Sequence, residues 1–339
     1  MKNSASFFEG GMAVKRLFVL ILAFLLLCGC AVSPAEEATV TVQQTVPVEP
    51  TLSHKAPPLP EVRPLMEIPP EPVSVVLQPE ASGEAVAENE EAIIDYSNTE
   101  AGYVMARYTA STDSRLKVLL KGPTTTYAYN LPVDEWTTFP LSDGNGHYQM
   151  GIYINVRDTK YAAVLFTEFD VELTDEFAPF LRPNQYVNYT DASNTVQLGA
   201  ELTLGMDHPL EKVAAVYDHV IHNFSYDYEK AETVKSGYLP ELDAVLEEGK
   251  GICFDYAALM TAMLRSQQVP CKLVVGYAGD IYHSWISVWT EENGWIDGAI
   301  FFDGHQWKRM DPTFASSGEG DPEIMDFIVN GTYMAKYLY

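Results

Sequence analysis

The chain has 339 residues, of which 47% are hydrophobic, and this is enough for two folded domains with buried cores. Its formal net charge is −26, because 47 acidic residues outnumber 21 basic ones. With no basic stripe to neutralise phosphates, the composition argues against nucleic acid or anionic lipid as a partner.

The first thirty residues have the features of a targeting segment. Lys15 and Arg16 precede the apolar run LFVLILAFLLL, which is too short to span a bilayer but fits the core of a secretory signal. The next residues, Cys28-Gly29-Cys30, resemble a bacterial lipobox, which implies cleavage before Cys30 and lipidation of that cysteine. An ordinary signal peptide with two incidental cysteines is the alternative, and Met12 is an alternative start to Met1.

Residues 1–30 therefore predict an exported protein that is lipid-anchored to the outer face of the bacterial cytoplasmic membrane, at the cell surface or in the periplasm. The lipid is the predicted link to the membrane. Only Cys253 and Cys271 remain in the exported body, fewer than a domain held together by disulfides would usually contain. The two could still pair with each other.

Residues 31–95 have a different composition from the rest of the chain. They contain 11 of the 21 prolines and no aromatic residue. Such a stretch buries too little apolar surface to fold, and its prolines favour extended conformations. We therefore expect 31–95 to be a disordered linker that holds the folded part away from the membrane.

Residues 96–200 predict a β-domain followed by a connector. Turn signals separate stretches of aromatic and β-branched residues. The expected strands are 103–109, 116–120, 126–129, 137–141, 148–156 and 162–173. Short strands at this spacing favour an immunoglobulin-like β-sandwich. The region has no grouped metal ligands, so we assign it a structural or binding role, and we expect 174–200 to be an ordered connector.

After residue 204 the apolar pattern changes to helical spacing, so 201–339 predicts a separate α+β domain. The expected helices are 208–224, 239–248 and 253–267. The expected strands are 271–277, 282–289, 295–302 and 305–310.

Cys253 is the candidate nucleophile of this domain. A free thiol is mostly protonated at neutral pH, and a helix N-terminus or a nearby imidazole favours the reactive thiolate. Gly251 allows a tight turn just before the helix that begins at Cys253. His283 and Asp311 are the best candidates for the base and its orienting group. Trp285 would share a strand face with His283 and could shield the site from water.

Four motifs in this order resemble the transglutaminase-like superfamily, a group related to papain. They are Gly251-Ile252-Cys253-Phe254-Asp255-Tyr256-Ala257, then Gln268-Val269-Pro270-Cys271-Lys272, His283-Ser284-Trp285 and Asp311-Pro312-Thr313. The resemblance covers roughly residues 205–315. It implies a papain/transglutaminase-like fold, with the nucleophile at a helix N-terminus that packs on an antiparallel sheet.

The resemblance implies acyl transfer through a thioester, with Cys253 as nucleophile, His283 as base and then acid, and Asp311 as orienting carboxylate. The Cys253 N–H is one natural oxyanion donor. Tyr226 is a second candidate, although a core tyrosine is the simpler interpretation. The expected substrate is a protein or peptide, with cell-wall peptide as one option. Hydrolysis is slightly favoured over cross-linking, and a non-catalytic binding or scaffold protein that keeps the fold is the alternative.

Several residues have simpler interpretations. Gln268 and Lys272 replace the family's usual glycine and arginine at a helix–strand corner, and Cys271 fits a small buried residue. We expect Asp255 to make a structural hydrogen bond rather than act as an acid. His219 and His222 lie three apart but lack further ligands, so no metal is predicted. His305 fits a turn, and no motif calls for a cofactor.

Overall fold

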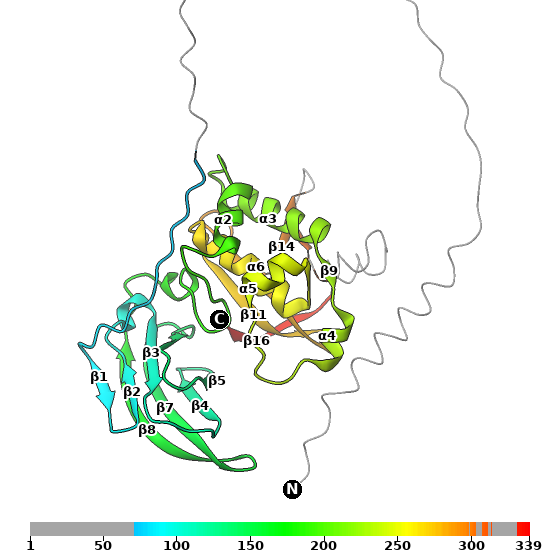
Figure 1. Cartoon of the computed structure of the whole chain (residues 1–339). Helices are drawn as coiled ribbons and strands as arrows, with labels where there is room; N and C mark the ends of the chain where they lie inside the picture. The colour runs from blue at the N-terminus through cyan, green and yellow to red at the C-terminus, as the bar shows by residue number, and fades with distance from the viewer. Residues whose placement is uncertain (1–70, 298, 303–306, 311–312, 314–330) are drawn as a thin grey trace, which may run out of the picture. The chain divides into compact units, whose positions relative to one another are not determined.

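The computed structural model describes residues 71–297, 299–302, 307–310, 313 and 331–339. Residues 70–339 form one compact unit, in which an all-β part precedes a part that mixes helices and strands (Figure 1). One cluster of buried apolar residues extends through both parts. The predicted α+β class is confirmed, and the two predicted domains share a core.

The all-β part contains two four-stranded antiparallel sheets. The first has the order β1-β2-β3-β6, with bounds Val86–Glu88 (β1), Ala92–Asp95 (β2), Tyr103–Tyr108 (β3) and Thr137–Pro140 (β6). The second has the order β5-β4-β7-β8, with bounds Thr126–Leu131 (β5), Leu116–Lys121 (β4), Gly146–Arg157 (β7) and Lys160–Val171 (β8). All six predicted strands are present, and each end lies within two residues of the prediction.

Alternation of side chains gives each sheet one buried face. In β4, Leu116, Val118 and Leu120 are buried, whereas Lys121 is exposed. The ring of Tyr129 in β5 packs edge-on against Phe139 in β6 at 4.9 Å, so the two sheets share apolar contacts. An immunoglobulin-like arrangement of these strands stays a prediction.

The predicted linker is wrong at its C-terminal end, because residues 86–95 belong to the first sheet. Ala92 and Ile94 are fully buried, and the Asp95 carboxylate accepts hydrogen bonds from the backbone N–H groups of Gly83 and Ser97. Composition over a long window hid this short strand pair, since the last proline of the stretch is Pro79. The part of the linker before residue 71 lies outside the described residues.

The mixed part is built around one buried helix, α6 (Cys253–Ser266), in which every side chain from Asp255 onward is buried. Helices α2, α3 and α5 contact it, together with strand β11 (Figure 1). The helix bounds are Asn194–Leu202 (α2), Pro209–Asn223 (α3), Tyr228–Thr233 (α4) and Leu242–Glu248 (α5), and the bounds of the two 3-10 turns are Thr99–Ala101 (η1) and Ala178–Phe180 (η2). None of the helices in the described part of the chain is long and apolar enough to cross a membrane.

A four-stranded antiparallel sheet with the order β13-β12-β11-β16 packs against α6. Its strands are Gly294–Asp297 (β13), Ile281–Thr290 (β12), Cys271–Ala278 (β11) and Tyr333–Leu338 (β16). Two small sheets pair β9 (Ser225–Tyr226) with β10 (Lys250–Gly251), and β14 (Ala299–Phe302) with β15 (Trp307–Met310). The single strand predicted over 295–302 is therefore two strands in different sheets.

Helix α2 lies in the stretch that was predicted to be a connector. Its N-terminus is capped from a distance: the Asp243 carboxylate, at the start of α5, accepts bonds from the backbone N–H groups of Asn194 and Thr195 at 3.0 and 2.9 Å. A carboxylate at this position satisfies free donors and complements the helix dipole. The cap that starts α2 thus comes from a residue 49 positions away from Asn194, so the sequence around residue 194 does not predict where the helix begins.

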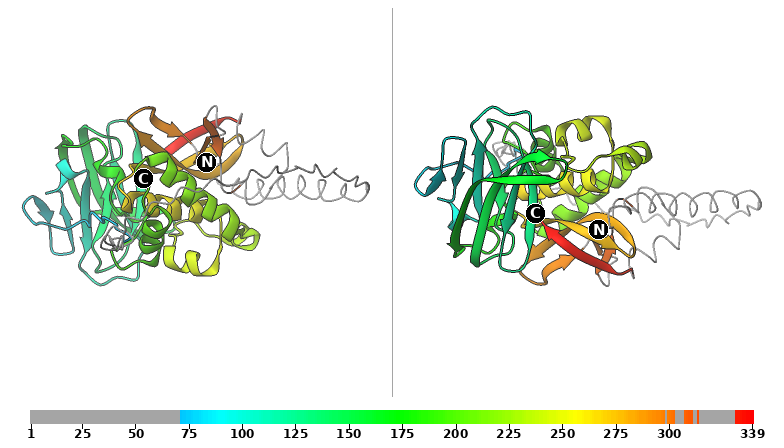
Figure 2. Two further views of the ribbon diagram at one scale, coloured as in Figure 1. Left: turned by 90° about the horizontal axis from the view of Figure 1, so that it is seen from above. Right: turned by 90° about the horizontal axis from the view of Figure 1, so that it is seen from below.

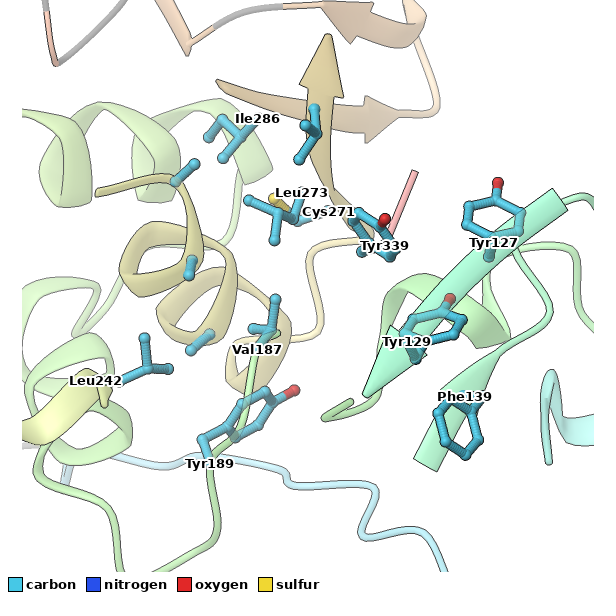
Figure 3. Packing of buried hydrophobic residues seen from close by; sticks show 14 of the residues in the cluster. Tyr127, Tyr129, Phe139, Val187, Tyr189, Leu242, Cys271, Leu273, Ile286 and Tyr339 are labelled. Atoms are coloured by element: carbon cyan, nitrogen blue, oxygen red, sulfur yellow. The ribbon is translucent and has the colours of Figure 1, made fainter. Parts of the chain in front are cut away.

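Tyrosines join the all-β part to the mixed part. Tyr339 packs against Tyr127 and Tyr129 of β5 at ring distances of 5.7 and 5.8 Å, and against Tyr186 at 4.4 Å. Figure 3 shows Tyr339 between these β5 rings and the Cys271–Leu273 end of β11, and Figure 2 shows the strands and helices from two further sides. The junction is thus packed like a core, with paired aromatic rings.

The Arg265 guanidinium fixes the C-terminal end of α6. The side chain is fully buried and donates to three main-chain oxygens, those of Cys271, Arg182 and Tyr339, at 2.9, 2.6 and 2.7 Å. Burial lowers the pKa of Arg265, and the three main-chain oxygens replace the water that the cation has lost.

We predict that Arg265→Met lowers the free energy of unfolding by about 3–5 kcal/mol, because three main-chain oxygens lose their donor. Urea denaturation of the purified protein measures this change. Arg107→Met is the matched control, since Arg107 pairs with Asp134 on the surface and its loss should cost less than about 1 kcal/mol. Equal losses of unfolding free energy in the two variants would contradict the role of Arg265 as a buried hydrogen-bond donor.

Candidate active site

Cys253 is the first residue of α6, and only Ile252 separates it from the short strand β10. Its thiol is free and half-buried. Gly251 is needed in the approach, since a Cβ there would lie 2.8 Å from the Asp255 Cβ. The first N–H groups of a helix lack partners within the helix, and its dipole favours an anion, so this position suits a thiolate.

Tyr226 lies next to the nucleophile turn. It pairs with Gly251 in the parallel β9–β10 bridge, and the Asp227 N–H donates to the Gly251 carbonyl at 2.8 Å. Burial, and then the charge of a Cys253 thiolate, raise the pKa of Tyr226 well above its usual value. The phenol therefore keeps its proton and remains a hydrogen-bond donor beside the thiol.

His283 and Trp285 share one face of β12, as predicted, and both are 3% exposed. Their rings stack at 6.3 Å, and Tyr333 of β16 packs edge-on against Trp285 at 5.2 Å. His283 pairs with Gly276 of β11. The imidazole is thus almost fully shielded from water, which strengthens its electrostatic interactions.

The start of β12 lies within electrostatic range of the nucleophile. Burial is the main cause that raises the pKa of Tyr282, and a Cys253 thiolate adds to the increase. Tyr282 precedes His283 in the chain, and α6 packs on β12. The fold thus brings the two predicted residues into one region of the molecule.

Two predicted site residues lie outside the described part of the chain. Asp311 follows the last residue of β15, Met310, and Cys30 lies in the N-terminal segment. Their roles stay predictions, and so does the turn position of His305.

Cys271 is a buried residue of the sheet and has no part in the site. Its thiol donates to the Thr261 hydroxyl at 3.6 Å, and burial raises its pKa to about 11. Thr261 lies eight residues along α6 from Cys253, about 12 Å by helix geometry. A disulfide needs Cα atoms within about 7 Å, so the structure rules out a bond between Cys253 and Cys271.

Asp255 makes structural hydrogen bonds, as expected. It is fully buried, and its carboxylate accepts from the Ile252 N–H at 2.9 Å and from the Tyr238 hydroxyl at 2.6 Å. Lys230 Nζ lies 2.7 Å from the same carboxylate. The sequence did not reveal these partners. Lys230 and Tyr238 lie between the predicted helices 208–224 and 239–248, where the local pattern gives no sign of a contact with Asp255.

The other two expectations for this region concern Lys272 and the histidine pair. Lys272 Nζ lies 3.5 Å from the centre of the Trp295 ring and 4.8 Å from that of Phe180, and burial lowers its pKa to about 8. It therefore supports packing at the helix–strand corner. His219 and His222 lie on α3, and among the described residues no group of three His, Cys, Asp or Glu side chains could hold a metal ion.

Residues 196–298 match the model of the Transglutaminase-like superfamily, and this range contains Cys253 and His283. YebA of Bacillus subtilis (strain 168) is 32% identical over 119 residues, which cover 29% of this chain and 16% of YebA. A protein-glutamine gamma-glutamyltransferase of Pseudomonas aeruginosa is 27% identical over 114 residues, which cover 29% of this chain and 17% of that protein. The resemblance read from the motifs is thus confirmed.

Among solved structures, a “Putative Cysteine Protease” from Cytophaga hutchinsonii has a TM-score of 0.36 at 17% identity and covers 70% of this chain and 76% of that one. A red sea bream transglutaminase has a TM-score of 0.26 at 13% identity, with 69% of this chain and 56% of that one covered. The chain spans about a sixth of the length of the curated relatives it matches.

We predict that Gly276→Ala lowers the free energy of unfolding by about 3 kcal/mol, because a Cβ at this position would meet the Met334 carbonyl of β16. Gly151→Ala is the matched control: it also adds a methyl to a strand, but the nearest atoms belong to the far end of the Tyr153 side chain and not to the backbone. Its loss should stay below about 1 kcal/mol. Urea denaturation compares the two, and equal stabilities would show that β16 does not approach Gly276 closely.

Proposed function

We propose that the chain, which contains a transglutaminase-like domain over residues 196–298, is an exported cysteine-dependent acyl-transfer enzyme. One observation carries the proposal: within the family match, a free, half-buried thiol begins the central helix, next to a strand that carries a buried histidine. Cys253 would act as nucleophile, His283 as base and then acid, and Asp311 as the group that orients His283.

The chemistry follows from these roles. The Cys253 thiolate forms a bond to the carbonyl carbon of an amide, and charge moves onto the carbonyl oxygen. The C–N bond then breaks, and the leaving amine takes a proton from the His283 imidazolium, which leaves a thioester on Cys253. In the second half, neutral His283 takes a proton from water as its oxygen attacks the thioester. The C–S bond breaks and the carboxylic acid leaves. The proton taken from water stays on His283, so the Cys253 thiolate and the His283 imidazolium are regenerated.

The backbone N–H of Cys253 and the protonated phenol of Tyr226 would donate to the oxygen on which charge develops. Trp285 would limit access of water to His283. Both proposals rest on position: Tyr226 pairs with Gly251 just before the nucleophile, and Trp285 stacks beside His283.

The proposed substrates are peptide, isopeptide or glutamine-amide bonds of a protein or peptide, and cell-wall peptide is one candidate. The Pseudomonas relative bears the name of an enzyme that transfers glutamyl groups, so an amine is a possible second acceptor. We favour hydrolysis slightly, because an exported enzyme meets water at high concentration and both reactions use the same thioester.

We further propose that Cys30 carries the lipid, that the chain is anchored outside the cytoplasmic membrane, and that residues 31–70 act as the tether. The N-terminal sequence supports this, with its apolar run followed by Cys28-Gly29-Cys30. For strands β1–β8 we propose an immunoglobulin-like sandwich, supported by two antiparallel four-stranded sheets with buried inner faces.

We predict that Cys253 of the wild-type chain reacts with iodoacetamide near pH 7 at least 10-fold faster than an ordinary thiol, because it lies at a helix N-terminus with His283 as its proposed base. His283→Ala should lower the rate at least 10-fold, whereas His222→Ala, an exposed histidine on α3, should leave it unchanged. Peptide-resolved mass spectrometry separates Cys253 from the other cysteines. A Cys253 that reacts slowly in all three proteins would favour the alternative, a non-catalytic binding or scaffold protein.

We also predict that the mature protein extracted from membranes begins at Cys30 and carries lipid on that residue, which intact-mass spectrometry detects. Cys30→Ala should move the protein to the soluble fraction. Cys28→Ala, two residues earlier, should leave it in the membrane fraction. An unmodified residue 30 in membrane-extracted protein would remove the lipoprotein assignment.

A further inference from the structure

The feature behind this inference is the fully buried carboxylate of Asp255, two residues after the nucleophile. The carboxylate contacts the Ile252 N–H, the Tyr238 hydroxyl and the Lys230 ammonium. An isolated buried charge is very unfavourable, so a carboxylate at this position needs a compensating cation. Lys230 supplies it at 2.7 Å.

The compensating cation belongs to a separate segment, residues 227–241, which includes α4. Lys230 Nζ also lies 4.5 Å from the centre of the Tyr238 ring, so the lysine and the tyrosine contact each other as well as Asp255. The Lys230 side chain is 24% exposed. The ion pair therefore holds this segment against the start of α6.

The pair lies close to the reacting thiol. Asp255 accepts from the N–H of Ile252, the residue that precedes Cys253, and its Cβ fills the space that Gly251 leaves open. The charges of Cys253 and Asp255 both raise the pKa of Tyr226, so both groups lie near that phenol. Asp255 thus holds the turn at Gly251 and Ile252, which sets the direction of Cys253, through this hydrogen bond and this contact.

We propose that Lys230 and Asp255 are positioning residues for the acyl-transfer reaction: Asp255 holds the nucleophile turn, and Lys230 neutralises Asp255 so that Cys253 can exist as a thiolate. The inference rests on the proposed function, because it takes Cys253 as the nucleophile. It adds that activation of the thiol depends on a lysine 23 positions earlier in the chain.

Lys230 acts on Cys253 through its charge. Asp255 without its cation would place an uncompensated negative charge near Cys253, and like charges oppose ionisation of the thiol. Lys230 cancels that charge and leaves the helix N-terminus and His283 to favour the thiolate. The charged and titratable side chains around this turn come from several elements: Lys230 and Tyr238 (segment 227–241), Lys250 (β10) paired with Asp227 at 3.1 Å, Tyr226 (β9), and Tyr282 and His283 (β12).

This arrangement predicts opposite effects for the two members of the pair. Lys230→Gln leaves Asp255 uncompensated, so the pH midpoint of Cys253 labelling should rise by about half to one pH unit. Asp255→Asn leaves Lys230 uncompensated, so the midpoint should fall by a similar amount. Lys230→Arg keeps the charge and should restore the wild-type midpoint.

The experiment measures the rate of iodoacetamide labelling of Cys253 between pH 5 and 9 in the full chain, with peptide-resolved mass spectrometry. Lys212→Gln is the matched control, because it removes the same charge at the opposite end of α6, where Lys212 Nζ donates to the Gln267 carbonyl. That end lies about 20 Å from Cys253 by helix geometry, so the control should not shift the midpoint. Thermal unfolding of each variant checks that it is folded.

A purely structural pair would give a different result: both substitutions would lower the unfolding temperature and move the midpoint in the same direction or not at all. That outcome overturns the inference. If Asp255→Asn does not fold, the series Lys230→Gln, Lys230→Arg and Lys212→Gln decides alone, and equal midpoints in all three overturn it. Failure of the proposed function gives a different result from failure of this inference. In that case His283→Ala would leave the labelling rate of Cys253 unchanged.

Discussion

A buried guanidinium links the distant parts of this structure. Arg265 donates to main-chain oxygens of the connector, of β11 and of the residue after β16, and so joins four segments through one side chain. Only arginine carries enough donors in a fixed plane to do this, because lysine would place a single ammonium there. Tyr339 takes part in both contacts, since its main-chain oxygen accepts from Arg265 and its ring packs against β5. The all-β part and the mixed part are held together at this point.

Helix α6 carries a buried charge near each end, and the two charges are balanced differently. At the C-terminal end the cation of Arg265 is surrounded by three main-chain oxygens, which accept its hydrogen bonds. At the N-terminal end the anion of Asp255 is neutralised by Lys230. This end also carries the half-buried thiol, so the helix is rigidly packed along its length while Cys253 stays accessible. A nucleophile on a rigid element keeps its direction, which acyl transfer requires.

Much of this arrangement could be predicted from local sequence patterns. The turn at Gly251, the helix that begins at Cys253 and the shared face of His283 and Trp285 all depend on spacing within a few residues, and the structure has them. Long-range contacts were not predictable in the same way. The cap of α2 comes from Asp243, the cation for Asp255 comes from Lys230, and the strand pair around Ile94 was concealed by the proline-rich stretch before it. The strand expected over 295–302 is split between two sheets, because apolar alternation does not say which partner a strand has.

The central claim is that Cys253 forms a thioester with the acyl group of its substrate. The most direct measurement is the pre-steady-state release of p-nitrophenolate from p-nitrophenyl acetate by the full chain, combined with mass spectrometry of the acylated protein. The account predicts a burst that approaches one nitrophenolate per chain, with the acetyl group on the peptide that contains Cys253, and no burst in Cys253→Ala. An equal burst in Cys253→Ala, or acetyl groups only on other residues, would contradict it.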